Sequence, residues 1–303
     1  MPAAADGEIL VRTTASSICG SDLHGVFLGA PGPDSPPGYP GHESVGEVLE
    51  SRTPDFAPGD WVLAVPQASA GRCLAEFQAL PGSACIKLPA GVPVQELLMA
   101  QQLGTVIFAL ARHQVDLAGK DVAVIGQGSA GAFFTFLARN AGARQVLVSD
   151  KSAARLAYGK FLGADVAVDA NAGDLGEAVL DATGGRGADV VIEAVGTREA
   201  FASVVEMAAP DATVVWFGLP EGPEPYPFDF PGFFRRKLTA YTIFGAQGEP
   251  GLVSFRTAVQ LIAGGEIDVS PLLSHLLPID EVEEAFHIAH DRTGNALKVS
   301  ITF

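Results

Sequence analysis

Residues 122–131 read Val-Ala-Val-Ile-Gly-Gln-Gly-Ser-Ala-Gly, an apolar run that passes into a glycine-rich turn. The four apolar residues predict a strand that is covered on both faces. The small and apolar stretch 130–141 predicts a helix, which Gly142 ends. A second apolar run, 146–150, ends on the carboxylate of Asp150, roughly 20 residues after the glycines. This order of strand, turn, helix and acidic strand end indicates a dinucleotide-binding βαβ unit.

The three glycines of the turn have distinct expected roles. Gly126 permits the tight turn after the strand, Gly128 lets the backbone approach a pyrophosphate, and Gly131 lets the helix pack closely. The first N–H groups of the helix then face the phosphates. The candidate coenzyme contacts in this turn are Gly126, Gln127, Gly128, Ser129, Ala130 and Gly131.

Asp150 is expected to accept hydrogen bonds from the ribose hydroxyls of the coenzyme. It favours NAD over NADP, because a carboxylate there would repel a 2′-phosphate. Lys151 and Arg155 follow closely in the sequence. Both are candidate coenzyme contacts that would weaken the preference for NAD. The alternative is that they are solvated surface charges.

The composition excludes several classes of protein. The 303 residues include 19 Lys and Arg against 35 Asp and Glu, and the net charge of −16 opposes binding to nucleic acid or to an anionic membrane surface. No apolar run reaches the roughly 20 residues that a membrane span needs, and the first residues do not read as a signal peptide. We therefore expect a cytoplasmic protein with a small-molecule substrate.

The pattern of elements divides the chain into three segments. Residues 1–101 contain short apolar runs between turn residues, which predicts a mainly β domain. Residues 102–245 alternate strand and helix patterns, which predicts an α/β fold with a doubly wound parallel sheet of the Rossmann type. Residues 246–303 contain two helix patterns and a final strand. The further strands predicted for the sheet are Val166–Asp169, Asp189–Val195, Thr213–Gly218 and Leu238–Phe244, with a long loop at Pro220–Pro231 between the last two.

Two compact polar clusters lie upstream of the dinucleotide unit. Residues 19–24 read Cys-Gly-Ser-Asp-Leu-His, and residues 41–46 read Gly-His-Glu-Ser-Val-Gly. A thiol, an imidazole and a carboxylate are the ligands of a catalytic zinc that keeps one position open. Taken separately, Cys19 reads as a buried small residue and the pair His42-Glu43 as an ordinary surface pair. Their joint occurrence favours a metal site that forms when the fold brings the clusters together.

With these motifs in this order, the chain resembles the medium-chain zinc alcohol dehydrogenase family, especially its polyol and threonine dehydrogenase branch. The resemblance covers nearly the whole chain. It implies a GroES-like β catalytic domain beside the Rossmann domain, to which residues 246–303 return. The matching pieces are the two polar clusters, Pro58-Gly59-Asp60-Trp61-Val62, the glycine turn with Asp150, Leu162-Gly163-Ala164-Asp165 and Asp189-Val190-Val191-Ile192-Glu193-Ala194-Val195-Gly196.

The resemblance also implies roles for the residues of the polar clusters. Cys19 and His42 would ligate the zinc, with Glu43 beside it or bound to it. Asp22 would orient the His42 ring and fix its tautomer.

Two further pairs of residues take their expected roles from the resemblance alone. Ser21 and His24 match positions that relay the alcohol proton to solvent in some members. Val195 and Gly196 would contact the coenzyme.

The chain departs from the family pattern in two places. Where a Glu or Cys ligand is usual, this chain has Gln101-Gln102, and a neutral amide is a poor zinc ligand. The four-cysteine lobe that holds a structural zinc is missing, so Cys73 and Cys85 are interpreted as packing residues. We expect one catalytic zinc and no structural zinc, and the two glutamines leave open whether the catalytic zinc is retained.

The expected function is that of an NAD-dependent dehydrogenase that transfers a hydride between NAD(H) and a secondary alcohol or polyol, with zinc as Lewis acid. The alternatives are a zinc-independent NAD(P)H reductase of quinones or enones, a redox-neutral lyase or epimerase, and a non-catalytic nucleotide-binding relative. The resemblance implies a homodimer joined through Leu238–Phe244, which would cover an exposed strand edge.

Overall fold

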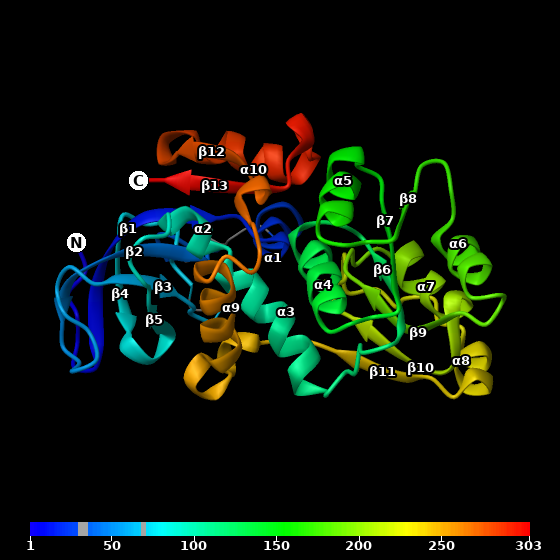
Figure 1. Cartoon of the computed structure of the whole chain (residues 1–303). Coiled ribbons are helices and arrows are strands. Elements are labelled where there is room, and N and C mark those ends of the chain that lie inside the picture. The colour runs from blue at the N-terminus through cyan, green and yellow to red at the C-terminus, as the bar shows by residue number, and fades with distance from the viewer. Residues whose placement is uncertain (30–35, 68–70) are drawn as a thin grey trace. The chain divides into compact units, whose positions relative to one another are not determined.

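The computed structural model of the chain describes residues 1–29, 36–67 and 71–303. The chain forms two compact units. Unit 1 comprises Met1–Phe108 and Gly245–Phe303, and unit 2 comprises Ala109–Phe244. The chain therefore leaves unit 1, builds unit 2 and returns to complete unit 1 (Figure 1).

Unit 1 is built on a largely antiparallel sheet. Seven strands of its described residues pair in the order β12-β13-β1-β2-β3-β5, with β4 beside β1. Buried aliphatic side chains such as Ile9, Val11, Val48 and Val62 pack together on this sheet. The strands are β1 (Glu8–Ser17), β2 (Ser44–Ser51), β3 (Trp61–Ala64), β4 (Phe77–Pro81), β5 (Cys85–Lys87), β12 (Leu273–Pro278) and β13 (Lys298–Thr302).

Strand β1 connects the first residues of unit 1 to its C-terminal segment. It pairs antiparallel with β2, and its end pairs with β13, where Ser17 lies opposite Ser300. The backbone N–H of Ile18 donates to the carbonyl of Val299 at 3.0 Å. The start of β13 is thereby placed next to the end of β1, so residues from opposite ends of the sequence meet there.

A long apolar helical stretch, Val94–Arg112, begins in unit 1 and runs to the first residues of unit 2, and length and composition alone would allow it to cross a membrane. Half of this stretch is buried, and Leu97, Leu103 and Val106 are fully enclosed. It is therefore a core helix. The helices that contribute to unit 1 are α1 (Gly20–Leu23), α2 (Val94–Leu98), α3 (Ala100–Arg112), α9 (Val253–Ala263) and α10 (Val282–Asp291).

Unit 2 is a six-stranded parallel sheet with helices between its strands (Figure 1). Its described strands have the order β11-β10-β9-β6-β7-β8, so the predicted doubly wound α/β fold is confirmed. The strands are β6 (Asp121–Ile125), β7 (Gln145–Asp150), β8 (Val166–Asp169), β9 (Ala188–Glu193), β10 (Ala208–Trp216) and β11 (Thr239–Thr242). The helices are α4 (Ser129–Asn140), α5 (Ala153–Phe161), α6 (Leu175–Ala182), α7 (Arg198–Met207) and α8 (Phe230–Arg236).

The strand order reverses between β6 and β9. From β6 the chain adds β7 and β8 on one side, and then β9 to β11 on the other. All five residues of β6 are buried, as expected for a central strand covered on both faces. In sheets of this kind ligands bind beyond the carboxyl ends of the strands at such a reversal.

The start of strand β10 and the end of the loop 220–231 differ from the sequence-based expectation. Strand β10 begins at Ala208 rather than Thr213, because the chain bends at Asp211 with φ of 62° and then resumes pairing with β9 after a register shift. The segment 220–231, expected to be all loop, ends in helix α8, where the Asp229 side chain accepts from the Gly232 N–H at 2.9 Å. An Asp N-cap followed by Pro231 is a helix-start signal that the sequence already contained.

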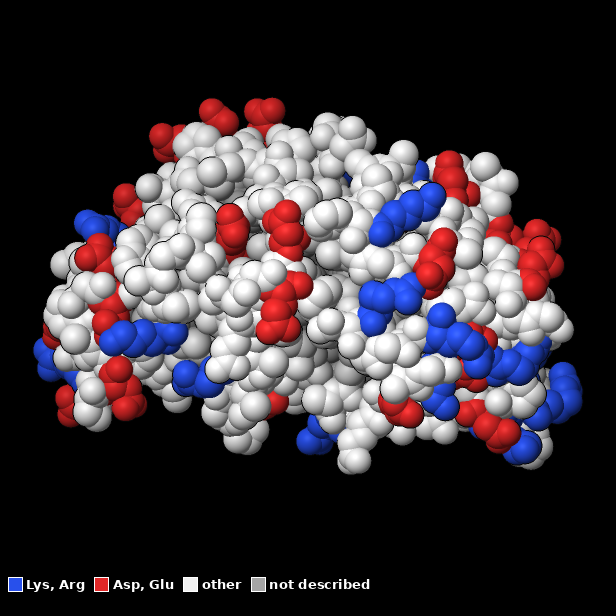
Figure 2. Space-filling view, in the orientation of Figure 1, with Lys and Arg blue, Asp and Glu red and all other residues white. Residues whose placement is uncertain are grey.

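The charged side chains are distributed as the composition suggests. On the face shown in Figure 2, acidic side chains are spread over the whole view, and the basic side chains that gather at its lower right lie among acidic ones.

Candidate active site

The pairing of β1 with β2 brings the two polar clusters together. Ser16 lies opposite Ser44, and the Ser17 N–H donates to the Glu43 carbonyl at 3.2 Å. Because the strands are antiparallel, the residues that follow β1 lie beside those that precede β2. Cys19 and His42 therefore become neighbours, although they are distant in sequence.

Cys19 is held at the start of a short helix. It is the N-cap of α1, with extended backbone angles of −90° and 155°. Its N–H donates to Asp22 Oδ2 at 2.8 Å, and Asp22 is only 2% exposed. This contact fixes the backbone from which the thiol projects.

His42 is oriented by the other oxygen of the same carboxylate. His42 Nδ1 lies 2.9 Å from Asp22 Oδ1, and both side chains are buried. With Nδ1 bound to the carboxylate, Nε2 remains for a metal ion. Burial alone would lower the pKa of His42, but the negative charge of Asp22 and its hydrogen bond, with a smaller contribution from Cys19, raise this pKa well above its ordinary value.

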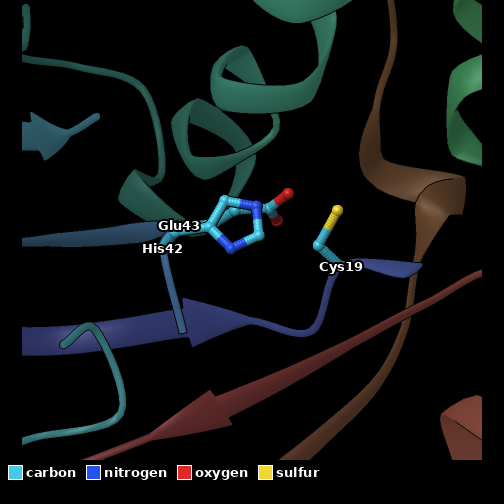
Figure 3. A group of neighbouring side chains, drawn as sticks. All are labelled: Cys19, His42 and Glu43. Atoms are coloured by element: carbon cyan, nitrogen blue, oxygen red, sulfur yellow. The ribbon is translucent and has the colours of Figure 1, made fainter. Parts of the chain in front are cut away.

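Cys19, His42 and Glu43 form a compact group of potential ligands. One ligand atom from each lies within 4.8 Å of the other two. Figure 3 shows Cys19 on one segment and the adjacent residues His42 and Glu43 on another. Zinc bonds to S, N and O measure about 2.0–2.3 Å, so small side-chain movements would let one ion contact all three atoms. Three protein ligands with one open position are typical of a catalytic zinc.

Glu43 takes part in a buried ion pair. Its Oε2 lies 2.7 Å from Lys298 Nζ, with the two side chains 1% and 3% exposed, and it also accepts from the Ser17 hydroxyl. Its Oε1 is buried and has no hydrogen-bond partner among the described residues. Burial would raise the pKa of Glu43, but the positive charges of Lys298 and His42 outweigh it and lower that pKa. The carboxylate is therefore ionised and has one unused oxygen.

Sequence reasoning missed Lys298 and Ser17. Lys298 is fully enclosed at the start of β13, in an otherwise largely apolar segment, Leu297–Phe303. Burial would lower the pKa of Lys298, but Glu43 raises it. The sequence did contain a signal for this contact: a single lysine stands in the largely apolar segment of the last strand. A lysine that is buried with such a strand requires a buried partner.

The two glutamines lie on α3, and Gln102 contacts this pair. Gln101 is 2% exposed, and its Nε2 has no hydrogen-bond partner among the described residues. Gln102 Oε1 accepts from Lys298 Nζ at 3.2 Å. The amide oxygen of Gln102 is thus directed at the ammonium group.

The remaining residues of the first cluster lie farther along the same turn. Ser21 is in α1, and His24 begins the π-helical turn His24–Leu28; both are partly exposed. Neither belongs to the group of ligand atoms.

Cys73 and Cys85 are free thiols in the core of unit 1, with exposures of 0% and 1%. Burial raises the pKa of both to about 12. Their interpretation as packing residues is confirmed.

The glycine turn of unit 2 follows β6. Gly126 has φ of 89°, a conformation that favours glycine. A Cβ at Gly131 would lie 1.9 Å from the Gly126 carbonyl oxygen, whereas a Cβ at Gly128 would have only Arg155 Nη1 nearby, at 3.8 Å. Gly131 therefore permits close packing of α4, and Gly128 leaves space above the backbone. Ser129 and Ala130 are the first residues of α4.

Gln127 contributes to this turn mainly through its backbone. Its N–H donates to Asp150 Oδ2 at 2.8 Å. Its side chain is fully buried, donates to the Gly126 carbonyl and accepts from the Thr135 hydroxyl. The side chain supports the turn from inside the fold.

Asp150 and Arg155 lie together at the end of β7. Asp150 Oδ1 accepts from the Ser152 N–H at 2.8 Å, and Arg155 Nη1 lies 4.0 Å from Asp150 Oδ2. The Arg155 side chain is only 12% exposed, so the alternative that it is a solvated surface charge is wrong. Lys151 is exposed, as that alternative expected.

Val195 and Gly196 follow β9, on the other side of the strand reversal. Their N–H groups donate to Glu193 Oε1 at 2.6 and 2.8 Å. Glu193 is 1% exposed, and burial raises its pKa despite these bonds. A Cβ at Gly126 would lie 2.6 Å from Val195 Cγ2. The two candidate coenzyme segments are therefore packed against each other, with Glu193, a residue that sequence reasoning missed, shaping the second.

Two family models match the chain. Residues 5–105 match the alcohol dehydrogenase GroES-like domain, and residues 130–264 match the zinc-binding dehydrogenase model.

Individual proteins match over nearly the full length. L-Threonine 3-dehydrogenase of Coxiella burnetii (strain Dugway 5J108-111) is 26% identical, over 96% of this chain and 91% of the relative. The alcohol dehydrogenase TADH of Thermus sp. ATN1 superposes with a TM-score of 0.87 at 26% identity, over 100% of this chain and 94% of that one. A Sinorhizobium meliloti 1021 protein, described only as a zinc-binding dehydrogenase and solved with NADP bound, gives the same TM-score, identity and coverage.

Proposed function

Because the chain belongs to the medium-chain zinc-dependent alcohol dehydrogenase family, we propose that it transfers a hydride between NAD(H) and a secondary alcohol or polyol, or the corresponding ketone. The chain is an enzyme of the alcohol dehydrogenase type. The observation that best supports the proposed reaction is the grouping of ligand atoms from Cys19, His42 and Glu43 within 4.8 Å.

In this proposal Cys19, His42 and Glu43 bind a single catalytic zinc. When bound, the zinc supplies the Lewis acidity that lowers the pKa of an alcohol toward neutrality. The protein's own residues set the ligand geometry. Asp22 holds the His42 ring with Nε2 available and fixes the backbone of Cys19. Ser21 and His24, partly exposed on the same turn, are proposed to pass the released proton to solvent.

The coenzyme is proposed to bind at the carboxyl ends of β6 and β9. The N-terminus of α4 and the open backbone at Gly128 would receive the pyrophosphate. Val195 and Gly196 would bound the site on the β9 side. In these terms residues 102–245 form the coenzyme-binding domain, and residues 1–101 with 246–303 form the catalytic domain.

NAD is proposed as the main coenzyme because Asp150 lies where the ribose would bind. Both of its carboxylate oxygens accept backbone N–H groups, which keeps the charge at a fixed place. The adjacent Arg155 offers a cation to a 2′-phosphate, and the Sinorhizobium relative is bound to NADP. We therefore expect weaker, Arg155-dependent use of NADP.

The substrate class follows from the relatives. L-Threonine, named for the Coxiella enzyme, carries a secondary hydroxyl group beside polar groups. A small secondary alcohol with polar neighbouring groups is therefore the proposed substrate.

The cytoplasm is the proposed compartment, because the three free thiols would stay reduced there.

A homodimer is proposed through the free edge of β11. Among the described strands β11 pairs with β10 only, and Phe234 and Phe244 near its two ends are 70% and 91% exposed. Antiparallel pairing of two such edges would cover backbone groups that otherwise invite aggregation. A monomeric mass in solution would contradict this part of the proposal.

The reaction is tested by zinc content together with Cys19→Ser. We expect about one zinc per chain in protein purified without chelator, NAD-linked oxidation of secondary alcohols, and loss of turnover in Cys19→Ser with NADH binding retained. Unchanged turnover in that variant would overturn the metal assignment.

Zinc-free protein that reduces quinones or enones would instead support the metal-independent reductase, which Gln101 and Gln102 motivate. Product formation without net change in NADH absorbance would indicate a lyase or epimerase. NADH binding without turnover of any substrate would indicate a non-catalytic relative.

A further inference from the structure

The ammonium group of Lys298 lies between two side chains that compete for a role at the metal. It is 2.7 Å from Glu43 Oε2 and 3.2 Å from Gln102 Oε1. Glu43 belongs to the group of ligand atoms. Gln102 is one of the two glutamines that stand where the family usually offers a third ligand. One buried cation therefore contacts both candidates.

The two oxygens of Glu43 are not equivalent. Oε2 accepts from Lys298 and from the Ser17 hydroxyl, whereas Oε1 is buried without a partner among the described residues. Leaving a buried carboxylate oxygen unsatisfied is costly, and an ion beside Cys19 and His42 would satisfy it. The contacts to Oε2 thus select Oε1 as the ligand atom.

The amide of Gln102 is turned to the same cation. Its only acceptor atom, Oε1, accepts a hydrogen bond from the Lys298 ammonium group. Its NH₂ group is a hydrogen-bond donor and cannot bind a metal ion. The contact therefore directs the amide oxygen of Gln102 at the ammonium group.

Resting on the proposed function, we propose that Lys298 is a positioning residue for the metal: it fixes Glu43 so that Oε1 faces the ion and holds Gln102 off it. Cys19, His42 and Glu43 would then hold the zinc, which would supply a Lewis acid for the substrate. The contact between Lys298 and Oε2 holds the Glu43 side chain in place before zinc binds. Mutation of a residue that holds a metal ligand in place typically lowers metal affinity by about 10–100-fold. We expect an effect of this order of magnitude for Lys298.

The test is the zinc affinity of variants, measured by competition with a chromogenic chelator. Lys298→Met should lower the affinity by about 10–100-fold, while Lys298→Arg, which can bond both Glu43 and Gln102, should remain within about threefold of the wild type. Lys87→Met is the matched control, because Lys87 is 57% exposed and pairs with Asp60. Wild-type affinity in Lys298→Met would overturn the proposal.

A second variant covers the case in which Lys298→Met does not fold. Gln102→Glu places a carboxylate beside the Lys298 ammonium, within the glutamine pair that stands where the family usually offers an acidic ligand. If Lys298 holds residue 102, the new carboxylate pairs with the ammonium, and the visible spectrum of the Co²⁺-loaded protein stays that of the wild type. A changed ligand-field spectrum with tenfold tighter binding or more, of order 1.4 kcal/mol, would show that residue 102 reaches the ion and would overturn the proposal.

These outcomes are distinguishable from failure of the proposed function. If wild-type protein binds no zinc and Cys19→Ser changes nothing, the metal site itself is wrong and both proposals fall. If wild-type protein binds about one zinc per chain and only the Lys298 and Gln102 variants contradict expectation, the dehydrogenase proposal stands and the role of Lys298 falls.

Discussion

Asp22 Oδ1 lies 2.9 Å from His42 Nδ1, while its second oxygen accepts from the backbone N–H of Cys19 at 2.8 Å. One buried carboxylate therefore holds two of the three candidate ligands. This bridge links a short helix to the segment before β2, so the ligand geometry depends on a residue that does not belong to the group of ligand atoms itself.

Removing this bridge should weaken metal binding. Asp22→Ala leaves Cys19 N–H and His42 Nδ1 without their acceptor, and we expect zinc affinity to fall by about 10–100-fold. Asp22→Asn keeps an oxygen acceptor without the charge and should lose less. Chelator competition measures both. Equal affinities for the wild type and Asp22→Ala would contradict the expectation.

Zinc affinity should depend on pH through His42. Its pKa is raised well above the ordinary value in the metal-free protein, so the imidazolium must lose a proton before Nε2 can bind. Below that pKa, affinity should therefore rise with pH by about tenfold per unit for each proton displaced. Isothermal titration in buffers of different ionisation enthalpy counts the protons released. An affinity that is constant between about pH 6 and pH 8 would contradict this.

Substitutions at two glycines of the turn in unit 2 should have different effects, one on the stability of the fold and the other on coenzyme binding. Gly131→Ala places a Cβ 1.9 Å from the Gly126 carbonyl oxygen, and we expect a loss of about 1–3 kcal/mol in the free energy of unfolding. Gly128→Ala meets only Arg155 Nη1, at 3.8 Å, and Gly128 has φ of −60°. It should fold normally and yet bind NADH poorly. Denaturant unfolding and NADH fluorescence report the two effects, and parallel losses in both variants would contradict the distinction.

Arg155 should control the remaining affinity for NADP. The Arg155→Gln variant removes the cation that lies 4.0 Å from Asp150, so we expect NADP(H) to bind about tenfold or more weakly, because a charge-assisted hydrogen bond is lost. NAD(H) affinity should change little. Lys151→Gln is the control, since Lys151 is exposed. Equal losses for the two coenzymes in Arg155→Gln would indicate a purely structural role.

The sequence predicted those parts of the fold that depend on local pattern. The run before Gly126 and the carboxylate of Asp150 sufficed for the βαβ unit, because the spacing of glycines and apolar residues reflects backbone geometry. Cys19 and His42 are distant in sequence, so only the tertiary fold can bring them together. The strand register that pairs Ser16 with Ser44 does so.

Other contacts were beyond sequence reasoning for a physical reason. Lys298 reaches Glu43 because β13 pairs with β1, and no local periodicity specifies which distant strands pair. The inward course of the Gln127 side chain and the contacts of Glu193 likewise depend on tertiary packing. A charged residue in a buried strand pattern indicates that a partner exists, but it does not identify that partner.

The return of the chain to unit 1 also bears on the order of events during synthesis. Cys19, His42 and Glu43 leave the ribosome early, whereas Lys298 follows only after all of unit 2 has been made. Until then the carboxylate of Glu43 lacks the cation that neutralises it, and β1 lacks one of its neighbouring strands. Because domains generally fold as units during translation, the growing chain can finish its nucleotide-binding unit first, and zinc capture becomes a late step of maturation.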